Sequence, residues 1–334
     1  MKSSIFDATK TDTELTKAYA GYIPEFIVGG LIRKLGKNIF AAERGTGKTR
    51  IMLFIAYAII YGCPEVFGYK INSFGDILFL NLEIPEKDFK AFSDPIIRYY
   101  ENKIGLKRIH NLYITSFREC GNKLNDIKLV VQKNKPFLVI IDSYKIYQSI
   151  ICSEEKERDI NNSNFEKVLR LMDELISEYQ TTIALINHTN KDTRNKESNA
   201  DLMFGPGALP DFVDHVTLLR KTKYPNQRII VPDKSRFCGE GYITTNLIEI
   251  KSTDPSSAYP DQLYFELIER DVDESDFLPL PQSKRIKPET KKQIVEFIQA
   301  GKGTQEQAAE KFLGRKSLKG TISKIINKYQ SSNT

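Results

Sequence analysis

Residues 42–50 read AERGTGKTR and match most of the phosphate-binding pattern G-x-x-x-x-G-K-[S/T]. In such a loop, consecutive backbone N–H groups point inward and the following helix presents its N-terminus, so both complement phosphate charge. Glycines permit the close approach, a lysine reaches the outer phosphates, and a hydroxyl ligates Mg²⁺. The sequence therefore predicts a site for ATP and Mg²⁺ formed by Glu43, Arg44, Gly45, Thr46, Gly47, Lys48, Thr49 and Arg50.

The pattern has one irregularity, because Ala42 occupies the position where the first glycine is usual. The stretch before the loop, KNIFAA, is an apolar strand pattern, and RIMLFIAYAII after it is an apolar helix pattern. This succession of strand, loop and helix is the context that the motif requires. We expect Ala42 to end the strand, where a methyl group is tolerated more readily than in the loop itself.

Two carboxylates end apolar stretches elsewhere, since PFLVIID ends in Asp142 and DILFLNLE ends in Glu83. If both stretches are parallel strands, these side chains lie beside the phosphate loop at the carboxyl edge of one sheet. We expect Asp142 to hold Mg²⁺ together with Thr49, and Glu83 to orient or deprotonate the attacking water. The alternatives are an Asp that caps a turn and a surface Glu that starts the next helix.

His188 closes a third strand-like stretch, TTIALINH, which is expected to reach the same edge. A polar side chain there can contact the γ-phosphate and report its loss to a nearby loop. A lone histidine is also common as a purely structural residue, so both interpretations of His188 stay open.

The elements that must position these residues alternate along the chain. Strand-like apolar stretches cover residues 37–43, 76–83, 111–116, 135–142 and 181–188, and helical periodicity covers 48–61, 85–102, 123–133 and 164–179. After residue 214 strand patterns follow one another without helices. The sequence predicts an α/β fold: a mostly parallel sheet flanked by helices, antiparallel strands added at its C-terminal side, and a small all-α C-terminal domain.

The composition is that of a globular protein, with 40% hydrophobic and 28% charged residues. The longest apolar run, residues 51–61, is too short to span a bilayer, and the N-terminal stretch lacks the apolar core of a signal peptide. We therefore expect a cytoplasmic protein with no membrane partner. Four cysteines without C-x-x-C spacing and only three histidines argue against zinc frameworks and disulfides.

Positive charge is concentrated at the C-terminal end. Residues 284–334 contain twelve Lys and Arg against four Glu, a net +8, so residues 1–283 carry −2 of the chain's +6. Such asymmetry is typical of a nucleic-acid-binding module, although a solvated basic face is the common alternative. The stretch LPLPQSKRIKP combines prolines with basic residues and is the best linker candidate. The predicted organisation is an arm at 1–21, a core at 22–277, a linker at 278–288 and a basic module at 289–330.

The core resembles the RecA-like ATPases and, more narrowly, the RepA and DnaB type of hexameric helicase. The resemblance covers about residues 22–270. It rests on the order of phosphate loop, Glu83, Asp142 and His188, and on the lead-in PEFIVGGLIRKLGKNIFAAERGTGKT, in which Ala is frequent at the first glycine position. DnaB-type helicases carry a substantial N-terminal domain, whereas about twenty residues precede the core here. That favours the compact RepA-like arrangement.

The resemblance also implies a site shared between subunits. The stretch DKSRFCGEG contains Lys234 and Arg236, similar to the K-x-R pair that hexameric helicases insert into the neighbouring active site. A cation supplied in trans stabilises charge on the γ-phosphate and ties hydrolysis to assembly, so a homo-oligomer, most simply a hexamer, is expected. Without the resemblance, K-x-R is an exposed basic turn.

Two segments are candidates for contact with single-stranded DNA in a central channel. The loop NHTNKDTRNKESNADLMFG carries Lys191, Arg194 and Lys196, which would neutralise backbone phosphates. The segment SYKIYQSIICSEEKERDINNSN after Asp142 is a second channel-loop candidate. Charged loops are often only solvated, which is the alternative for both.

The basic module resembles a helix-turn-helix of the resolvase type. Thr304 and Gln307 form a capping-box pattern before the helical stretch QEQAAEKF, in which Ala308 or Ala309 would give the close helix contact. The last helix, carrying Lys319 and Lys324, would face duplex DNA. Because the turn is about two residues longer than usual, a helical bundle for protein contacts remains the alternative.

The sequence thus predicts a Mg²⁺-dependent, DNA-stimulated ATPase of the hexameric helicase type, belonging to a mobile element, plasmid or phage. Its expected catalytic residues are Lys48, Glu83, His188, Lys234 and Arg236. A RecA-like ATPase switch or loader that assembles on DNA without unwinding it is the second hypothesis. A non-enzymatic regulator is the third, and the presence of Glu83 and the K-x-R pair argues against it.

Overall fold

The central sheet begins with the strand that precedes the phosphate loop. The computed structural model describes residues 9–116, 124–152, 162–189, 198, 209–235, 244–257, 260–278, 288–313, 319–320, 322–323 and 325–326. Within these residues the main sheet has nine strands in the order β13-β12-β11-β10-β3-β9-β8-β6-β7. Their bounds are β3 Lys37–Ala42, β6 Ile77–Asn81, β7 Leu112–Ser116, β8 Leu138–Asp142, β9 Thr182–His188, β10 His215–Lys221, β11 Gln227–Ser235, β12 Asn246–Ser252 and β13 Leu263–Glu269.

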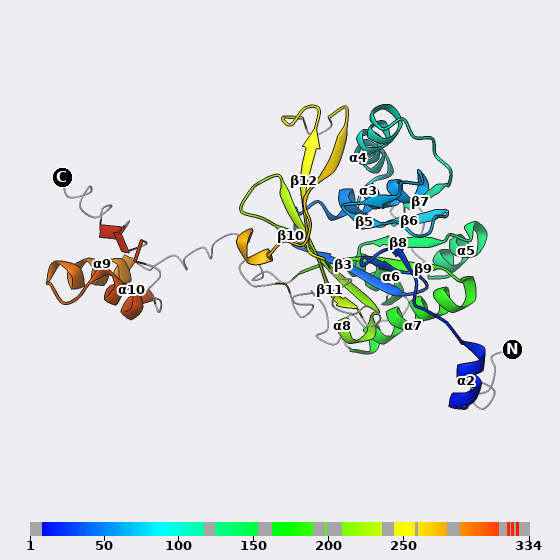
Figure 1. Cartoon of the computed structure of the whole chain (residues 1–334), viewed down its shortest axis with the longest axis horizontal. Helices are drawn as coiled ribbons and strands as arrows, with labels where there is room; N and C mark the ends of the chain where they lie inside the picture. The colour runs from blue at the N-terminus through cyan, green and yellow to red at the C-terminus, as the bar shows by residue number, and fades with distance from the viewer. Residues whose placement is uncertain are drawn as a thin grey trace. The chain divides into compact units, whose positions relative to one another are not determined.

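The strands from β10 to β7 run parallel, and β11, β12 and β13 are added antiparallel beside β10. Helices cover both faces of the parallel part (Figure 1). Their bounds are α3 Lys48–Ile60, α4 Glu86–Arg98, α5 Leu124–Asn134, α6 Tyr144–Cys152, α7 Asn162–Tyr179 and α8 Leu209–Phe212, with a π-helical turn at Tyr99–Lys103 and a 3₁₀ turn at Glu274–Asp276. The predicted α/β fold class is confirmed.

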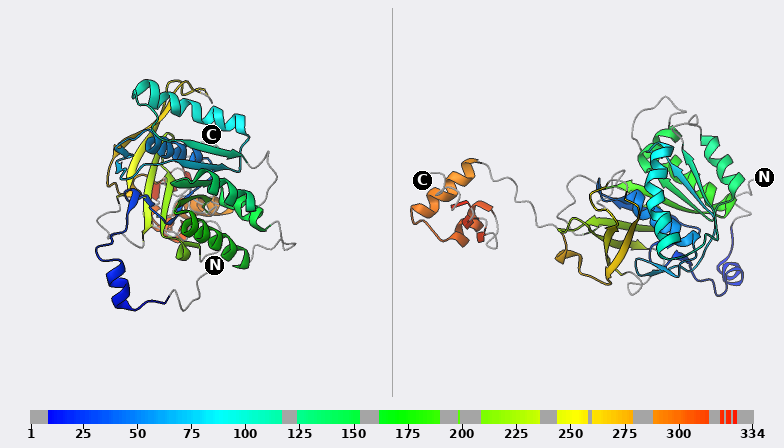
Figure 2. Two further views of the ribbon diagram at one scale, coloured as in Figure 1. Left: turned by 90° about the vertical axis from the view of Figure 1, so that its right-hand side faces the viewer. Right: turned by 90° about the horizontal axis from the view of Figure 1, so that it is seen from above.

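Two buried clusters fill the space on either side of the sheet because strand residues alternate between its faces. In β3, Phe40 and Ala42 join the cluster around α3, whereas Ile39 and Ala41 join the cluster beneath α6 and α7. Figure 2 shows these layers from two further directions. The face of the sheet toward which the last side chain of a strand points therefore depends on whether its position in the strand is odd or even.

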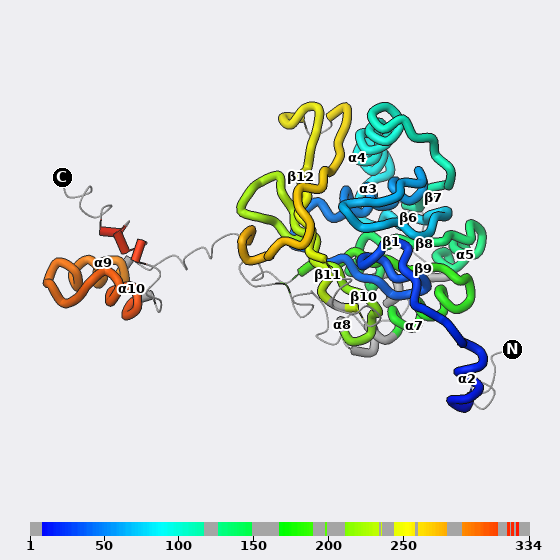
Figure 3. The backbone as a smooth tube through the Cα atoms, in the orientation of Figure 1, coloured from blue at the N-terminus to red at the C-terminus, as the bar shows by residue number. Residues whose placement is uncertain are grey.

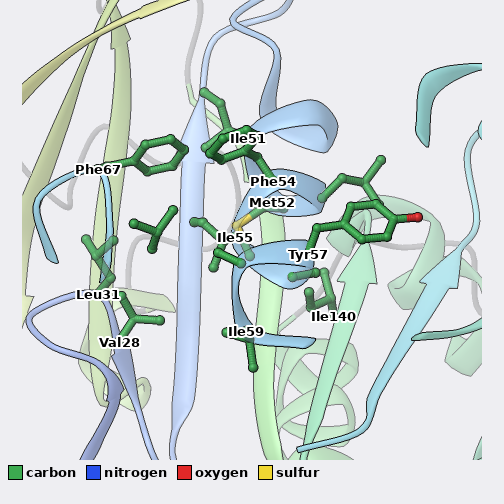
Figure 4. Close-up of a cluster of buried hydrophobic side chains, with 14 of the residues drawn as sticks. Val28, Leu31, Ile51, Met52, Phe54, Ile55, Tyr57, Ile59, Phe67 and Ile140 are labelled. Carbon is green, nitrogen blue, oxygen red and sulfur yellow. The ribbon is translucent and has the colours of Figure 1, made fainter. Parts of the chain in front are cut away.

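Helix α3 is buried on all sides, which explains why its sequence lacks a polar face. All ten residues from Ile51 to Ile60 are buried. Figure 4 shows part of this cluster, with Val28 and Leu31 from the N-terminal hairpin, Phe67 and the strand residue Ile140 around the helix. The phosphate loop is therefore followed by a helix whose position is fixed by packing rather than by its caps.

Small elements outside the main sheet were not expected from the sequence. Helix α2 spans Asp12–Ala18, and two hairpins pair β1 Phe26–Val28 with β2 Ile32–Arg33, and β4 Glu65–Val66 with β5 Tyr69–Lys70. The chain can be followed from α2 through these hairpins in Figure 3. The capping box of α2, formed by Thr11 and Glu14, starts this helix, although none of its residues is buried.

The predicted strands are confirmed, and the predicted helices are confirmed to within about two residues except at 85–102, where α4 ends at Arg98 and gives way to the π-helical turn. One prediction is contradicted at Tyr144–Cys152, whereas residues 153–161 of the same segment lie outside the described part of the chain. The second channel-loop candidate begins with helix α6, where Tyr144 and Tyr147 are buried in the cluster beneath the sheet. Tyr144 and Tyr147 explain this outcome, because they anchor the start of the segment to the core.

A second compact unit, Leu280–Thr334, is distinct from Met1–Pro279. It contains α9 Pro288–Gln299 and α10 Gln305–Leu313, with a small core of its own made by Ile294, Val295, Ala308, Ala309, Ile322, Ile325 and Ile326. The predicted capping box is confirmed. The Thr304 N–H donates to Gln307 Oε1 at 2.8 Å, and the Gln307 N–H donates to Thr304 Oγ1 at 3.3 Å. Ala308 and Ala309, of which one or the other was expected at the helix contact, are both buried. Among the described helices, none is long and apolar enough to cross a membrane.

Candidate nucleotide-binding site

The phosphate loop leaves β3 at the carboxyl edge of the sheet and leads directly into α3. Ala42 is the last strand residue and is fully buried in the cluster around α3. The missing glycine is thus explained by packing, since the methyl group faces the core. Two glycines of the loop adopt backbone angles that other residues avoid, with φ of +70° at Gly45 and +92° at Gly47. Gly47 is also the N-cap of α3.

Three strand ends meet the loop at this edge because their registers coincide. Ala42 pairs with His188 across β3 and β9, Asp142 pairs with Ile186 across β8 and β9, and Asn81 pairs with Asp142 across β6 and β8. Asp142 lies two positions beyond Ile140, and His188 two beyond Ile186, and both of those residues belong to the cluster around α3. Alternation therefore turns both side chains toward the face that carries the loop.

Thr49 and Asp142 are in direct contact. Thr49 Oγ1 donates to Asp142 Oδ2 at 2.6 Å, and Asp142 is buried. Burial raises the pKa of Asp142 to about 6, with the hydrogen bond from Thr49 acting in the opposite direction. Carboxylate and hydroxyl oxygens are the hard donors that Mg²⁺ prefers, and a cation beside this carboxylate would favour its charged form. The pair fits a magnesium site.

Glu83 is held just beyond the end of β6. Asn81 fixes the turn that carries it, because its side chain exchanges two hydrogen bonds with the main chain of Ile84 at 2.8 and 3.2 Å. Ser143 Oγ donates to Glu83 Oε1 at 2.5 Å, and His188 Nε2 lies 3.9 Å from the same oxygen. The nearby His188 ring and the hydrogen bond from Ser143 lower the pKa of Glu83 to about 2, against the opposing effect of burial. Glu83 is therefore ionised at neutral pH.

Lys48 and His188 connect the loop to Glu83. The Lys48 ammonium donates to the carbonyls of Ala42 and Glu43, both at 3.2 Å, and lies 3.1 Å from His188 Nδ1. Burial lowers the pKa of Lys48, while Asp142 and Glu83 oppose that shift. His188 thus stands between the loop lysine and the candidate catalytic carboxylate.

The remaining loop residues contribute mainly through their backbones. The Glu43 carbonyl accepts hydrogen bonds from the Thr46 hydroxyl and from Lys48, and Thr46 is fully buried. Arg44 is exposed. The Arg50 guanidinium lies over the Phe92 ring at 4.5 Å, so its side chain packs on α4.

Two further basic residues contact the loop, and no sequence pattern pointed to either. Lys221, at the end of β10, donates to the Arg44 carbonyl at 2.7 Å. Arg228, near the start of β11, donates to the Thr46 carbonyl at 2.9 Å. Their roles depend on β10 lying beside β3, which no local pattern reveals.

The residues expected to act between subunits or on DNA lie mostly outside the described part of the chain. Arg236, Lys191, Arg194, Lys196 and Lys324 all do. Lys234 lies in β11, where it pairs with Val216 near the start of β10. Lys319 forms an ion pair with Glu306 at 2.9 Å, and both side chains are exposed.

Comparison with known families agrees with this geometry. A family model described as an AAA domain matches residues 8–194. A comparison with curated proteins gives no match. The matched residues contain the phosphate loop, the Glu83 turn, and the strands that end in Asp142 and His188. Because the match extends over more than half of the 334 residues and includes this loop, the chain belongs to the AAA domain family of P-loop ATPases.

Proposed function

We propose that the protein is a Mg²⁺-dependent ATPase of the hexameric helicase type that acts on single-stranded DNA. The observation that carries the proposal is the convergence of Lys48, Thr49, Asp142 and Glu83 at one sheet edge, with a basic unit elsewhere in the chain. The convergence supports nucleotide hydrolysis. The basic unit supports DNA as the partner.

ATP would be held by the main-chain N–H groups of residues 43–50 and by the N-terminus of α3. The first turn of α3 carries no acidic residue, so nothing there opposes phosphate charge. Lys48 reaches the outer phosphates by exchanging its bonds to the Ala42 and Glu43 carbonyls for phosphate oxygens. Thr49 and Asp142 would hold Mg²⁺, which supplies positive charge against the oxygens of the transferring phosphoryl group.

Glu83 would orient the attacking water. A carboxylate with a pKa of about 2 is a weak proton acceptor, so its main contribution is to fix the water by a hydrogen bond. Ser143 keeps the carboxylate in place through its 2.5 Å bond. Movement of Lys48 toward phosphate would also release His188 Nδ1, and His188 could then change its distance to Glu83. These two movements would link the presence of the outer phosphate to the residues that follow His188.

Lys234, the first residue of the K-x-R pair, lies far along β11 from the phosphate loop of its own subunit. β11 starts beside the loop at Arg228 and runs antiparallel to β10, so Lys234 lies six residues away, about 20 Å along the strand. This separation supports donation of Lys234 and Arg236 to a neighbouring subunit, and with it a homo-oligomer, most simply a hexamer. ATPases of the AAA family often oligomerise.

DNA contact is proposed at two places. β9 ends at the nucleotide edge, so the segment with Lys191, Arg194 and Lys196 starts there and would line a central channel. The C-terminal unit, which carries most of the +8 charge of residues 284–334, would add contacts to duplex DNA through Lys319 and Lys324. The helicase would serve a mobile element, plasmid or phage.

The second candidate function is an ATPase switch or loader that assembles on DNA and recruits partners without unwinding. The separate core of the C-terminal unit favours it, because a module that folds around its own cluster can anchor an assembly that does not translocate.

A strand-displacement assay with ATP, beside the Lys48→Ala variant and parallel measurement of phosphate release, separates the two. We expect unwinding and DNA-stimulated hydrolysis, both abolished by Lys48→Ala. DNA-stimulated hydrolysis without unwinding would favour the switch, and absence of hydrolysis would overturn both. The mass of the assembly with ATP tests the shared site, since a strict monomer contradicts it.

A further inference from the structure

The two strands that flank the turn between β10 and β11 present two cations to the phosphate loop. Lys221 Nζ donates to the Arg44 carbonyl at 2.7 Å, and Arg228 Nε donates to the Thr46 carbonyl at 2.9 Å. We propose that Lys221 and Arg228 are positioning residues for nucleotide binding, which hold the loop in the conformation that receives phosphate. This proposal rests on the proposed function, because it takes residues 43–50 as the nucleotide site.

The geometry of the peptide bond explains why these two carbonyls matter. In a planar trans peptide the C=O and the N–H point in opposite directions. The Arg44 carbonyl shares its peptide with the Gly45 N–H, and the Thr46 carbonyl shares its peptide with the Gly47 N–H. Drawing both carbonyls outward therefore directs both glycine N–H groups inward, where a phosphate needs its donors.

Glycines are the residues that most need such restraint. Gly45 and Gly47 have positive φ and no Cβ, so many other backbone angles are open to them. A loop free to sample those angles would have to be ordered when nucleotide binds, at a cost to affinity. Hydrogen bonds from the neighbouring hairpin order the loop beforehand.

The two donors are well suited to this task. Arg228 is buried, and its NH1 group also donates to the carbonyls of Pro225 and Gln227 at 2.7 and 2.6 Å, so the guanidinium is fixed by its own turn. Lys221 follows directly after Arg220, whose buried ion pair with Glu274 at 3.0 Å anchors the end of β10. Hydrogen bonds from ionised donors are about twice as strong as neutral ones.

Charge adds to the effect of geometry. Within the described residues, all three hydrogen bonds of Arg228 go to main-chain carbonyls. None of these three bonds brings a carboxylate that would neutralise the positive charge of Arg228. Burial is the main cause of the lowered pKa of Lys48, and the positive charge of Lys221 acts in the same direction. The hairpin thus raises the positive potential at a site that must attract a polyanion.

The same turn offers a matched control. The Lys223 ammonium donates to the Asp276 carbonyl at 2.7 Å and lies 5.4 Å from the centre of the Tyr224 ring. Lys223→Met therefore removes one positive charge from the turn without removing either loop contact. Lys221→Met and Arg228→Met remove the contacts, whereas Lys221→Arg and Arg228→Lys keep a charged donor.

The test is the equilibrium affinity of the full-length chain for Mg²⁺·ADP, measured by isothermal titration calorimetry, with the thermal midpoint of the nucleotide-free protein as a second readout. We expect Lys221→Met to weaken binding by about tenfold, and Arg228→Met by about ten- to a hundredfold. Lys223→Met should stay within about twofold of wild type, and the two conservative variants should recover part of the loss. If Arg228→Met does not fold, the Lys221 series carries the test, because Lys221 is only partly buried.

Two outcomes overturn the inference. One is binding by Lys221→Met within about twofold of Lys223→Met, together with a lowered thermal midpoint, which would make the contact merely structural. The other is a wild-type chain that does not bind Mg²⁺·ADP. If wild type binds ADP and the variants weaken binding, but DNA does not stimulate hydrolysis, the helicase proposal fails and the positioning role stands.

Discussion

The Thr49 hydroxyl donates a 2.6 Å hydrogen bond to Asp142, joining the first turn of α3 to the carboxyl end of β8. Two residues that are 93 positions apart in the sequence thus bring two oxygen atoms of the metal-ligating kind together beside Lys48. If these two residues hold the proposed Mg²⁺, the phosphate loop and a distant strand must be correctly placed together for the metal to bind.

Replacing the hydroxyl tests this unit. Thr49→Val keeps the branched side chain but removes the oxygen, so Mg²⁺-dependent ATP hydrolysis should fall by at least about tenfold. Thr49→Ser retains the oxygen and should stay near wild type. The measurement is phosphate release as a function of Mg²⁺ concentration. Equal Mg²⁺ dependence of the Val and Ser variants would exclude Thr49 as a ligand.

Glu83→Gln separates binding from chemistry. The amide keeps the size of the side chain but orients water poorly, so kcat should fall by about 10²- to 10⁴-fold while ATP affinity changes only a few-fold. Glu86→Gln, at an exposed position in the first turn of α4, is the matched control. Single-turnover hydrolysis and equilibrium binding of ATP provide the two readouts. Hydrolysis at the wild-type rate by the Glu83→Gln variant would remove Glu83 from the mechanism.

Ala42→Gly restores the usual glycine of the loop and should not improve the site. The Ala42 methyl group is fully buried in the cluster around α3. Its loss, together with the greater backbone freedom of glycine, should lower the free energy of unfolding by about 1–2 kcal/mol. ATP affinity should remain within about threefold, since the first position contributes no side-chain contact to phosphate. Urea unfolding and nucleotide titration check the two parts, and a marked gain in affinity would show that alanine is a defect.

Much of this site could be predicted from the sequence because its residues end recognisable elements. Glu83, Asp142 and His188 each follow an apolar stretch of strand length, and parallel strands deliver their ends to one edge. The placement of the phosphate loop before α3 follows from the same local pattern. Fold class was likewise predictable, because the change from alternating elements to strands alone is visible in the hydrophobic periodicity.

The residues that sequence reasoning missed depend on which strands are neighbours. Lys221 and Arg228 meet the loop only because β10 pairs with β3, and that pairing joins segments almost 180 residues apart. Asn81 and Ser143 act through hydrogen bonds whose geometry is set by turns. α6 was missed because its polar continuation suggested a loop, although Tyr144 and Tyr147 anchor it to the core.

His215 should make stability depend on pH. Both of its ring nitrogens are buried, and burial lowers its pKa from 6.5 to about 4. The backbone of Gly30 and the neighbouring Asp214, which is engaged by Arg33 at 3.1 Å, act in the opposite direction. Between pH 6.5 and 4 the unfolded chain therefore binds a proton that the folded chain does not, and stability falls as the pH is lowered.

The loss attributable to His215 approaches about 3 kcal/mol near pH 4. His215→Phe, which keeps a ring against Phe26, should flatten the dependence of the urea midpoint on pH between 6.5 and 4. Above pH 6.5 the two slopes should agree, because His215 is neutral in both states. An unchanged slope in the variant below pH 6.5 would assign the acid sensitivity to other groups.

The proposed site between subunits can be tested by mixing two inactive chains. Lys48→Ala removes the phosphate-loop cation and Arg236→Ala removes the proposed finger, so each homo-oligomer should hydrolyse ATP poorly. In an equal mixture, about one site in four pairs the intact loop of an Arg236→Ala subunit with the intact finger of a Lys48→Ala neighbour. Hydrolysis should therefore recover to about a quarter of the wild-type rate after subunit exchange. A mixture no more active than its components would mean that Arg236 acts within its own subunit or not at all.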